Sequence, residues 1–204
     1  MIMYSGNSIS VAGDDSPLLP DIAIHLGRHQ RFGAACRHWW TVLHHSFVVE
    51  TLCMDMLQDK KRCYSASVRP YALLHDAHEC VTCDVPTPFK TDETRAIQDQ
   101  LDRRIFSAQG LPMPIASYKK VIKVADRRAM IAEGLVVGPP GWIAAYEASA
   151  GPLTFWDKHN LEHDAHIVSN VHSTYPTAHF SFEPDSLGVR DYIEAVEEAV
   201  LAAR

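Results

Sequence analysis

The chain has 204 residues, of which 47% are hydrophobic and 22% are charged, and its formal net charge is -6. This length suits one globular domain that buries a core without disulfides or a structural metal. The composition excludes a disordered or fibrous class. The negative charge excludes a general nucleic-acid coat, which needs surplus Lys and Arg to meet phosphate, so we expect no nucleic-acid polymer as a partner.

Signals for export and membrane insertion are missing from the sequence. No run approaches the length of a membrane-spanning helix, and the first residues lack the basic-then-apolar pattern of a secretory signal. The cysteines are irregularly spaced, and Cys80 and Cys83 have no second such pair with which to complete a zinc site. We therefore expect a cytoplasmic protein with reduced thiols and no membrane partner.

The first half of the chain predicts an arm and two helices. Residues 1–20 contain Ser, Gly, Asn and the run Asp-Asp-Ser-Pro, which is typical of a loose arm, so the folded domain is expected to span residues 21–204. Apolar residues recur at helical intervals over residues 37–58, which predicts a helix with a broad buried face. A second helix is expected to begin at Val68, with Pro70 in its first turn, and to end before two prolines impose an extended turn.

The second half of the chain predicts further helices. Thr91 can cap a helix that Gly110 ends, and residues 115–133 predict another that Gly134 closes. The sequence Gly-Pro-Pro-Gly at residues 138–141 is a firm break. Two less regular helices, a segment compatible with extended structure and a last amphipathic helix are then expected over residues 142–148, 156–171, 173–184 and 189–200.

Together these elements predict an all-α fold, a compact single-domain helical bundle. The sequence has no βαβ alternation and no glycine-rich phosphate loop. A nucleotide site in such a fold must be built from side chains between helices, which favours metal chemistry.

Acidic side chains and an imidazole gather at the end of the second predicted helix. His75, Asp76 and Glu79 interrupt an apolar segment, and Asp84 follows in the turn. Burial of isolated charges is unfavourable unless something compensates them. A divalent cation does so directly, because it binds both carboxylate oxygens and imidazole nitrogens.

Two other predicted helices offer further ligands. One imidazole of the pair His44 and His45 can point inward from the first helix, and Asp126 interrupts an apolar face of the fourth. Such a set leaves coordination positions for water and a phosphate oxygen, as catalysis requires. A second His-Asp-Ala-His sequence at residues 163–166 lacks the following Glu and the Asp-x-Pro turn, so we interpret it as a polar helix surface.

These motifs resemble those of the HD-domain phosphohydrolases, and among them the small enzymes that act on 5′-deoxynucleotides. They occur in the family's order across roughly residues 25–135. The resemblance implies a metal-dependent hydrolase with an HD-domain helical fold whose core motifs span residues 31–126. The matching segments are Arg31-Phe32-Gly33, Val42-Leu43-His44-His45-Ser46, Leu74-His75-Asp76-Ala77-His78-Glu79, Asp84-Val85-Pro86-Thr87-Pro88-Phe89-Lys90 and Lys123-Val124-Ala125-Asp126.

The resemblance also implies a metal site and an acidic pair. The family places its first ligand His directly before a Ser, so His45 is preferred over His44. Glu79 and Asp84 match the pair that orients or deprotonates the attacking water and assists the leaving oxygen. The implied ligands of a divalent ion, which can be Zn, Co, Mn or Mg, are His45, His75, Asp76 and Asp126.

Substrate-binding positions follow from the same resemblance. Arg31, Lys90 and Lys123 match positions near the phosphates, where fixed cations neutralise charge in the transition state. Phe32 takes the position of an aromatic ring that disfavours a ribose 2′-hydroxyl. Pro88 is similar to a proline of small dATP-hydrolysing enzymes that some phages encode. If a phage encodes this protein too, the expected location is the cytoplasm of its host.

The activity implied is hydrolysis of deoxynucleotide 5′-phosphates. A dNTP, with dATP first, is the expected substrate, because Lys90 and Lys123 suit extra phosphates. The alternatives are a 5′-deoxynucleotidase that acts on dNMPs, a hydrolase of signalling nucleotides, and a non-catalytic binding module. The partner is therefore expected to be a small-molecule nucleotide, and the resemblance also implies a homo-oligomer.

Overall fold

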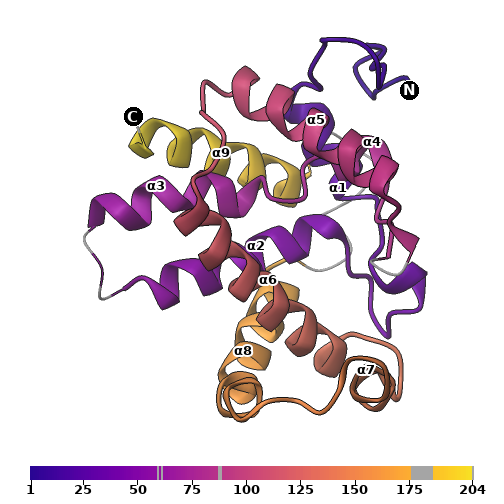
Figure 1. Ribbon diagram of the computed structural model, residues 1–204, viewed down its shortest axis with the longest axis vertical. Helices are drawn as coiled ribbons and strands as arrows, with labels where there is room; N and C mark the ends of the chain where they lie inside the picture. Colours follow the sequence, from indigo (N-terminus) through magenta and orange to yellow (C-terminus); the bar gives the residue numbers. More distant parts are fainter. Residues whose placement is uncertain (59, 61, 87–88, 176–185, 204) are drawn as a thin grey trace.

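Helices form the regular secondary structure of the described chain, apart from isolated β-bridges (Figure 1). The computed structural model describes residues 1–58, 60, 62–86, 89–175 and 186–203. The prediction of an all-α fold is confirmed. In chain order the elements are α1 (Leu19–Leu26), the 3-10 turn η1 (Phe32–Ala34), α2 (Val42–Met56), α3 (Arg62–Leu73), α4 (Glu79–Thr82), α5 (Asp92–Ala108), α6 (Ala116–Val136), α7 (Trp142–Ala150), α8 (Phe155–Thr174) and α9 (Leu187–Ala203).

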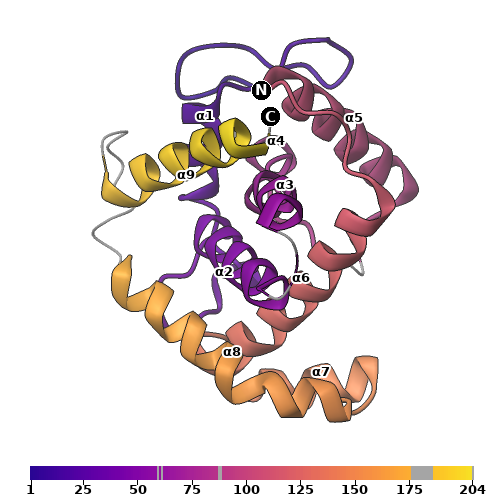
Figure 2. The same ribbon diagram turned by 90° about the vertical axis from the view of Figure 1, so that its left-hand side faces the viewer.

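Helix α2 lies in the middle of the fold, and α3, α6 and α8 pack against it (Figure 2). Its buried side chains occur on all sides, as expected of a helix that others surround. Helix α6 also packs on α8, and α3 packs on α9, so the two halves of the chain share one core and form a compact single domain. Fully buried residues of α2 include Val42, Leu43, Val48 and Leu52.

The N-terminal segment is packed and not the loose arm that we expected. Met3 and Ile9 are buried in the core. The backbone N–H and the hydroxyl of Ser5 donate to the carboxylate of Asp21 at 2.8 and 2.7 Å. Helix α1 begins at Leu19, inside the predicted arm, and is too short to give a clear periodic signal in the sequence.

The first predicted helix begins later than expected, at Val42. The chain before it is extended, with a β-bridge between Gln30 and Thr41. The N–H of Thr41 donates to His44 Nδ1 at 3.1 Å in a capping box, which starts the helix here.

The second predicted helix is divided into α3 and α4. Helix α3 begins at Arg62, well before Val68, so Pro70 lies inside the helix and not in its first turn. Backbone N–H groups after it bond to carbonyls three residues back, which turns the chain over residues 74–78. The short helix α4 then begins at Glu79. The His-Asp pair therefore lies in a turn between helices.

Gly134 lies inside α6 and does not end it, contrary to the prediction. A Cβ atom at this position would meet Trp142 Cε3 at 2.0 Å, so the glycine leaves room for the indole ring. Helix α6 continues to Val136, and the predicted break follows, with Gly141 at φ +80. Close packing and a helix end both favour glycine, and the sequence alone does not separate them.

The remaining helices agree with the predictions to within a few residues. Thr91 caps α5 by accepting the N–H of Thr94 at 3.1 Å, and Gly110 follows the helix at φ +70. The segment predicted as extended divides: residues 173–174 belong to α8, and residues 176–184 lie outside the described residues. Among the described helices, none combines the length and the apolar character needed to cross a membrane.

Candidate metal centre and adjoining cavity

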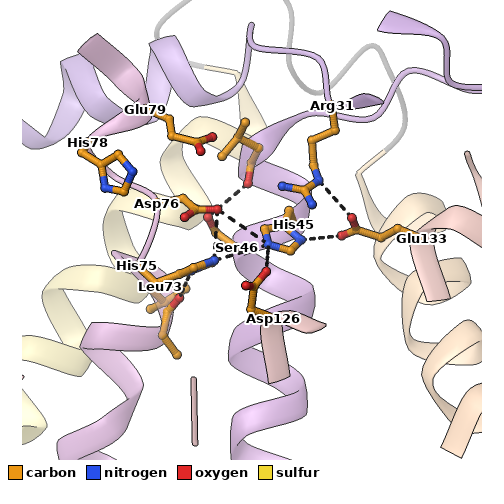
Figure 3. A network of polar contacts seen from close by, with 12 residues as sticks. Arg31, His45, Ser46, Leu73, His75, Asp76, His78, Glu79, Asp126 and Glu133 are labelled. Atoms are coloured by element: carbon orange, nitrogen blue, oxygen red, sulfur yellow. Dashed lines mark hydrogen bonds and ion pairs between the residues drawn. The ribbon is translucent and has the colours of Figure 1, made fainter. Parts of the chain in front are cut away.

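The side chains expected to hold a metal converge from three parts of the fold (Figure 3). His45 lies on α2, His75 and Asp76 lie in the turn after α3, and Asp126 lies on α6. His45 Nε2 is 3.1 Å from Asp126 Oδ1 and 3.3 Å from His75 Nε2. Asp76 Oδ2 is 3.1 Å from His75 Nε2 and 3.7 Å from His45 Nε2. Residues far apart in the sequence thus gather their ligand atoms around one point.

The Nε2 atoms of the two imidazoles face each other at 3.3 Å. His45 Nδ1 lies 2.8 Å from Glu133 Oε1, and His75 Nδ1 lies 2.8 Å from the Ala72 carbonyl oxygen. A carboxylate or carbonyl oxygen only accepts, so in each neutral imidazole the proton is on Nδ1 and Nε2 is unprotonated. Lone pairs that face carboxylates require positive charge between them. This donor set fits a divalent cation, and hydrogen bonds on the far ring nitrogens are typical of metal ligands.

The electrostatics of the centre point to the same need for positive charge. Burial lowers the pKa of His75, but the charge of Asp76 outweighs it and raises that pKa to about 9. Burial also opposes protonation of His45, yet Glu133 and Asp126 raise its pKa above the ordinary value. Burial would raise the pKa of Asp76, but His75 holds it well below its usual range. Metal binding must therefore displace protons from the imidazoles.

Glu133 belongs to this centre, although it was not among the predicted site residues. It is fully buried on α6, and its two oxygens contact His45 Nδ1 at 2.8 Å and Arg31 Nε at 3.0 Å. Burial would raise its pKa, but His45 and Arg31 lower it below the ordinary value. Glu133 follows Asp126 by about two helical turns, on the same face of α6, and that spacing is the signal in the sequence.

A cavity of about 670 Å³ opens beside the candidate ligands. This volume is in the range of small-molecule sites. Positive charges on its wall come from Arg31 and Lys90. The predicted site residues that line it are Arg31, Phe32, Asp76, Glu79, Asp84, Lys90 and Asp126.

Glu79 is the most buried acidic residue of the cavity wall, with only 2% of its surface exposed. Burial, together with the charges of Asp76 and Asp84, raises the pKa of Glu79 to about 9. Lys90 Nζ lies 3.7 Å from its Oε1. Carboxyl groups held in different environments can take different acid and base roles, so Glu79 and the half-buried Asp84 can divide such work between them.

Aromatic rings form another side of the cavity. Phe32 stands in the left-handed turn η1 at φ +54, a conformation that strains a residue with a side chain. Its ring centroid lies 5.6 Å from that of Trp142, edge to face. The sequence predicted Trp142 only as the start of a helix, and the structure adds it to the wall beside Phe32.

The other predicted substrate-binding residues lie elsewhere. Lys123 is exposed and lines a neighbouring cavity of about 590 Å³. Asp126 and Met130 line both cavities, so the two adjoin at a candidate metal ligand. Pro88 lies outside the described residues.

The competing motifs have structural partners. His44 Nε2 lies 2.9 Å from the Tyr175 carbonyl oxygen, directed away from the centre, which agrees with the preference for His45. The sequence at 163–166 is not simply a polar surface, because Asp164 is buried and accepts two hydrogen bonds from Arg128 at 2.9 and 2.6 Å. The five cysteines of the described chain are free thiols, as expected.

Comparison with known proteins adds no family assignment. No protein-family model matches the chain, and no curated protein matches it. What the site does must therefore be argued from its own residues and geometry.

Proposed function

We propose that this protein is a metal-dependent phosphohydrolase that acts on nucleotides. The observation that carries the proposal is the convergence of two imidazole nitrogens and two carboxylates beside a cavity whose wall holds two cationic side chains. Ligand atoms of His45, His75 and Asp126 lie within 4.8 Å of one another, and Asp76 Oδ2 lies 3.1 Å and 3.7 Å from the two imidazoles, so a divalent ion held by these four residues fits the donor set. Such an ion, when bound, makes water more acidic and polarises a phosphate oxygen.

The remaining residues of the cavity have roles that suit phosphate hydrolysis. Asp84 and Glu79 both line the cavity, and in this proposal Asp84 accepts a proton from the attacking water and Glu79, whose pKa is raised, donates one to the leaving oxygen. Arg31 and Lys90 offer fixed positive charge to a phosphoryl group. Phe32 offers a flat apolar wall, against which a ribose hydroxyl would lose its hydrogen bonds.

A deoxynucleoside triphosphate is the substrate that the two adjoining cavities support best. Their junction is Asp126, so a polyphosphate that binds at the metal can extend from Lys90 in one cavity toward Lys123 in the other. A monophosphate is the second candidate, because it needs only the first cavity and does not use Lys123.

The test is turnover of each dNTP and dNMP by purified protein that has been stripped with a chelator and reloaded with Mn²⁺, Co²⁺ or Zn²⁺. Phosphate, pyrophosphate and triphosphate are measured separately, which also identifies the bond that is cleaved. We expect release from dNTPs, with dATP first, that depends on the metal. If none of these nucleotides is hydrolysed with any of the ions, the proposal is wrong.

Substitution of Lys123 separates the two substrates. Lys123→Met should lower kcat/KM for dNTPs by about 10-fold to 100-fold, the effect of one charge-assisted hydrogen bond, and leave dNMP turnover unchanged. Lys119→Met is the matched control, since Lys119 is an exposed lysine on the same helix that lines neither cavity. Equal losses on dNTPs for both variants would contradict the role of Lys123.

A non-catalytic module is tested by removing two ligands together. In the double variant His75→Ala with Asp76→Ala, turnover should fall to background. The binding module would be favoured instead if the wild type showed no turnover and the double variant bound nucleotide as tightly as the wild type.

A further inference from the structure

A second group of potential metal ligands lies next to the first. The turn and helix α4 place Asp76, His78 and Glu79 so that one ligand atom from each lies within 4.8 Å of the others. Figure 3 shows His78 and Glu79 on the side of Asp76 that faces away from Asp126. His78 and Glu79 are only 7% and 2% exposed, so this group is not an exposed acidic patch.

One ring nitrogen of His78 has a partner and the other has none. Its Nδ1 lies 2.9 Å from Asp102 Oδ1 on α5, and a carboxylate oxygen only accepts, so Nδ1 donates to it. Nε2, which is a lone pair in the neutral ring, is buried with no hydrogen-bond partner among the described residues. A carboxylate that fixes the far nitrogen of an imidazole is the usual second-shell contact of a metal-binding His.

Glu79 has an equivalent unpaired atom. Its Oε1 is turned toward Lys90, whose Nζ lies 3.7 Å away. Its Oε2 is buried and has no hydrogen-bond partner within the described chain. Unpaired buried polar atoms are rare and unfavourable, and here two neighbouring side chains of one potential ligand group each have one.

We propose that His78 Nε2, a Glu79 oxygen and the carboxylate of Asp76 bind a second divalent cation. Such an ion satisfies both unpaired atoms at once. Because Asp76 also contacts His75 and His45, its carboxylate bridges the two ions. An imidazole ligand favours Mn²⁺, Co²⁺ or Zn²⁺ over Mg²⁺ and Ca²⁺, which prefer oxygen ligands alone.

A second ion at this position changes the roles that Glu79 and Asp84 have in the proposed reaction. Glu79 becomes a ligand, which leaves Asp84 as the carboxylate of the cavity wall that is free to orient water. Two bridged ions can stabilise both the attacking and the leaving oxygens of an in-line displacement. This catalytic consequence rests on the proposed function, whereas binding of the second ion does not.

The test is the number of Mn²⁺ ions bound per chain at saturation, measured on the stripped full-length protein by calorimetry and elemental analysis. We expect two ions in the wild type and one in His78→Gln. His163→Gln, which removes an exposed histidine that contacts Asp55, is the control and should keep two. One ion in the wild type, or two in His78→Gln, would overturn the proposal.

A matched pair of carboxylate variants gives the same answer without changing His78. Glu79→Gln and Asp84→Asn each replace one carboxyl group of the same cavity by an amide of the same size, but only Glu79→Gln should lose an ion. If both variants keep two ions, or both lose one, the assignment of Glu79 as a ligand is refuted. This pair decides the question if His78→Gln does not fold.

Electron paramagnetic resonance of the Mn²⁺-loaded protein reports the bridge. Two ions joined by the Asp76 carboxylate should give the signal of an exchange-coupled pair, which His78→Gln should convert to that of an isolated ion. Isolated-ion signals from a wild type with two ions would overturn the bridge. A protein that binds two coupled ions but hydrolyses no nucleotide would refute the proposed function and leave the second site standing.

Discussion

Glu133→Gln tests how far one buried carboxylate organises the metal centre. The side chain of Glu133 has no exposed surface, and that of Arg31, its ion-pair partner, is 12% exposed. The other Glu133 oxygen accepts from His45 Nδ1 and so fixes which ring nitrogen faces the candidate metal centre. The substitution keeps the size of the side chain and one acceptor for His45, but it leaves Arg31 facing an uncharged amide.

The magnitude follows from the burial of the pair. Removing one partner of a buried ion pair costs about 3–5 kcal/mol, and the lower end applies here because the bond to His45 can survive. For a chain of this length, about 3 kcal/mol lowers the midpoint of thermal unfolding by roughly 6–12 °C. Loss of a hydrogen bond that orients a metal-binding side chain typically weakens metal binding by about 10-fold to 100-fold.

The assays are thermal unfolding of the stripped protein and calorimetric titration with Mn²⁺. Glu162→Gln, an exposed residue on α8, is the control and should change stability by less than about 0.5 kcal/mol. The double variant Arg31→Met with Glu133→Leu should be less destabilised than the sum of the two single variants, because neither buried charge is left alone. An unchanged midpoint and an unchanged Mn²⁺ affinity in Glu133→Gln would refute the reasoning.

Three further outcomes are expected. Gly134→Ala should destabilise the protein, since its Cβ would meet the Trp142 ring at 2.0 Å. In a Trp142→Ala background the same change should be neutral or should stabilise the protein by up to about 1 kcal/mol. Urea unfolding of the wild type, the two single variants and the double variant checks this change of sign. Burial lowers the pKa of His44 to about 4, below its value of about 6.5 in the unfolded chain. The contribution of the neutral His44 to the free energy of unfolding is therefore complete above about pH 6.5, and roughly 3 kcal/mol of it is lost as the pH falls toward 4. In His44→Asn the amide oxygen can still accept the cap hydrogen bond, but no group titrates at this position. Urea unfolding of the stripped proteins should therefore show a smaller loss of stability over this pH range in His44→Asn than in the wild type; equal losses would contradict the lowered pKa of His44. Asp164→Asn should lower thermal stability but leave the number of bound Mn²⁺ ions unchanged, because Asp164 pairs with Arg128 and not with a metal.

The helical class and most helix positions could be predicted because periodicity and end signals agreed with each other. Thr91 and Gly110 mark the two ends of α5, and both signals depend only on neighbouring residues. The same reasoning was wrong at Gly134. Its small size makes room for the ring of Trp142 on α7, a tertiary contact that the local sequence does not reveal. The reasoning was also wrong about the end of α3, where a run of apolar residues continues through a turn. Local patterns report what a segment can do, and tertiary contacts then choose among these options.

The convergence of the candidate ligands could be predicted from the order of the motifs, but the atoms behind them could not. Glu133 lies in none of the motifs, and His78 lies within one of them but was given no role there. Their importance arises from Asp102 on α5 and from His45 on α2, partners that only the packing of the helices brings near. The direction of Lys123 was also open, since one helical position can face either of the two cavities beside α6.

Helix α6 joins these features into one mechanical unit. Asp126 and Glu133 lie on one face, and the His45 ring bridges them, with Nε2 3.1 Å from the first and Nδ1 2.8 Å from the second. Met130, between them in sequence, lines the cavity, and Gly134 receives the ring of Trp142. A shift of α6 along α2 would therefore disturb Asp126, the contact between Glu133 and His45, and the cavity wall together. A tightly packed helix moves as a rigid unit. Variants that move α6 should therefore lose metal affinity and nucleotide affinity in proportion, whereas variants of cavity residues alone should change one of these affinities without the other.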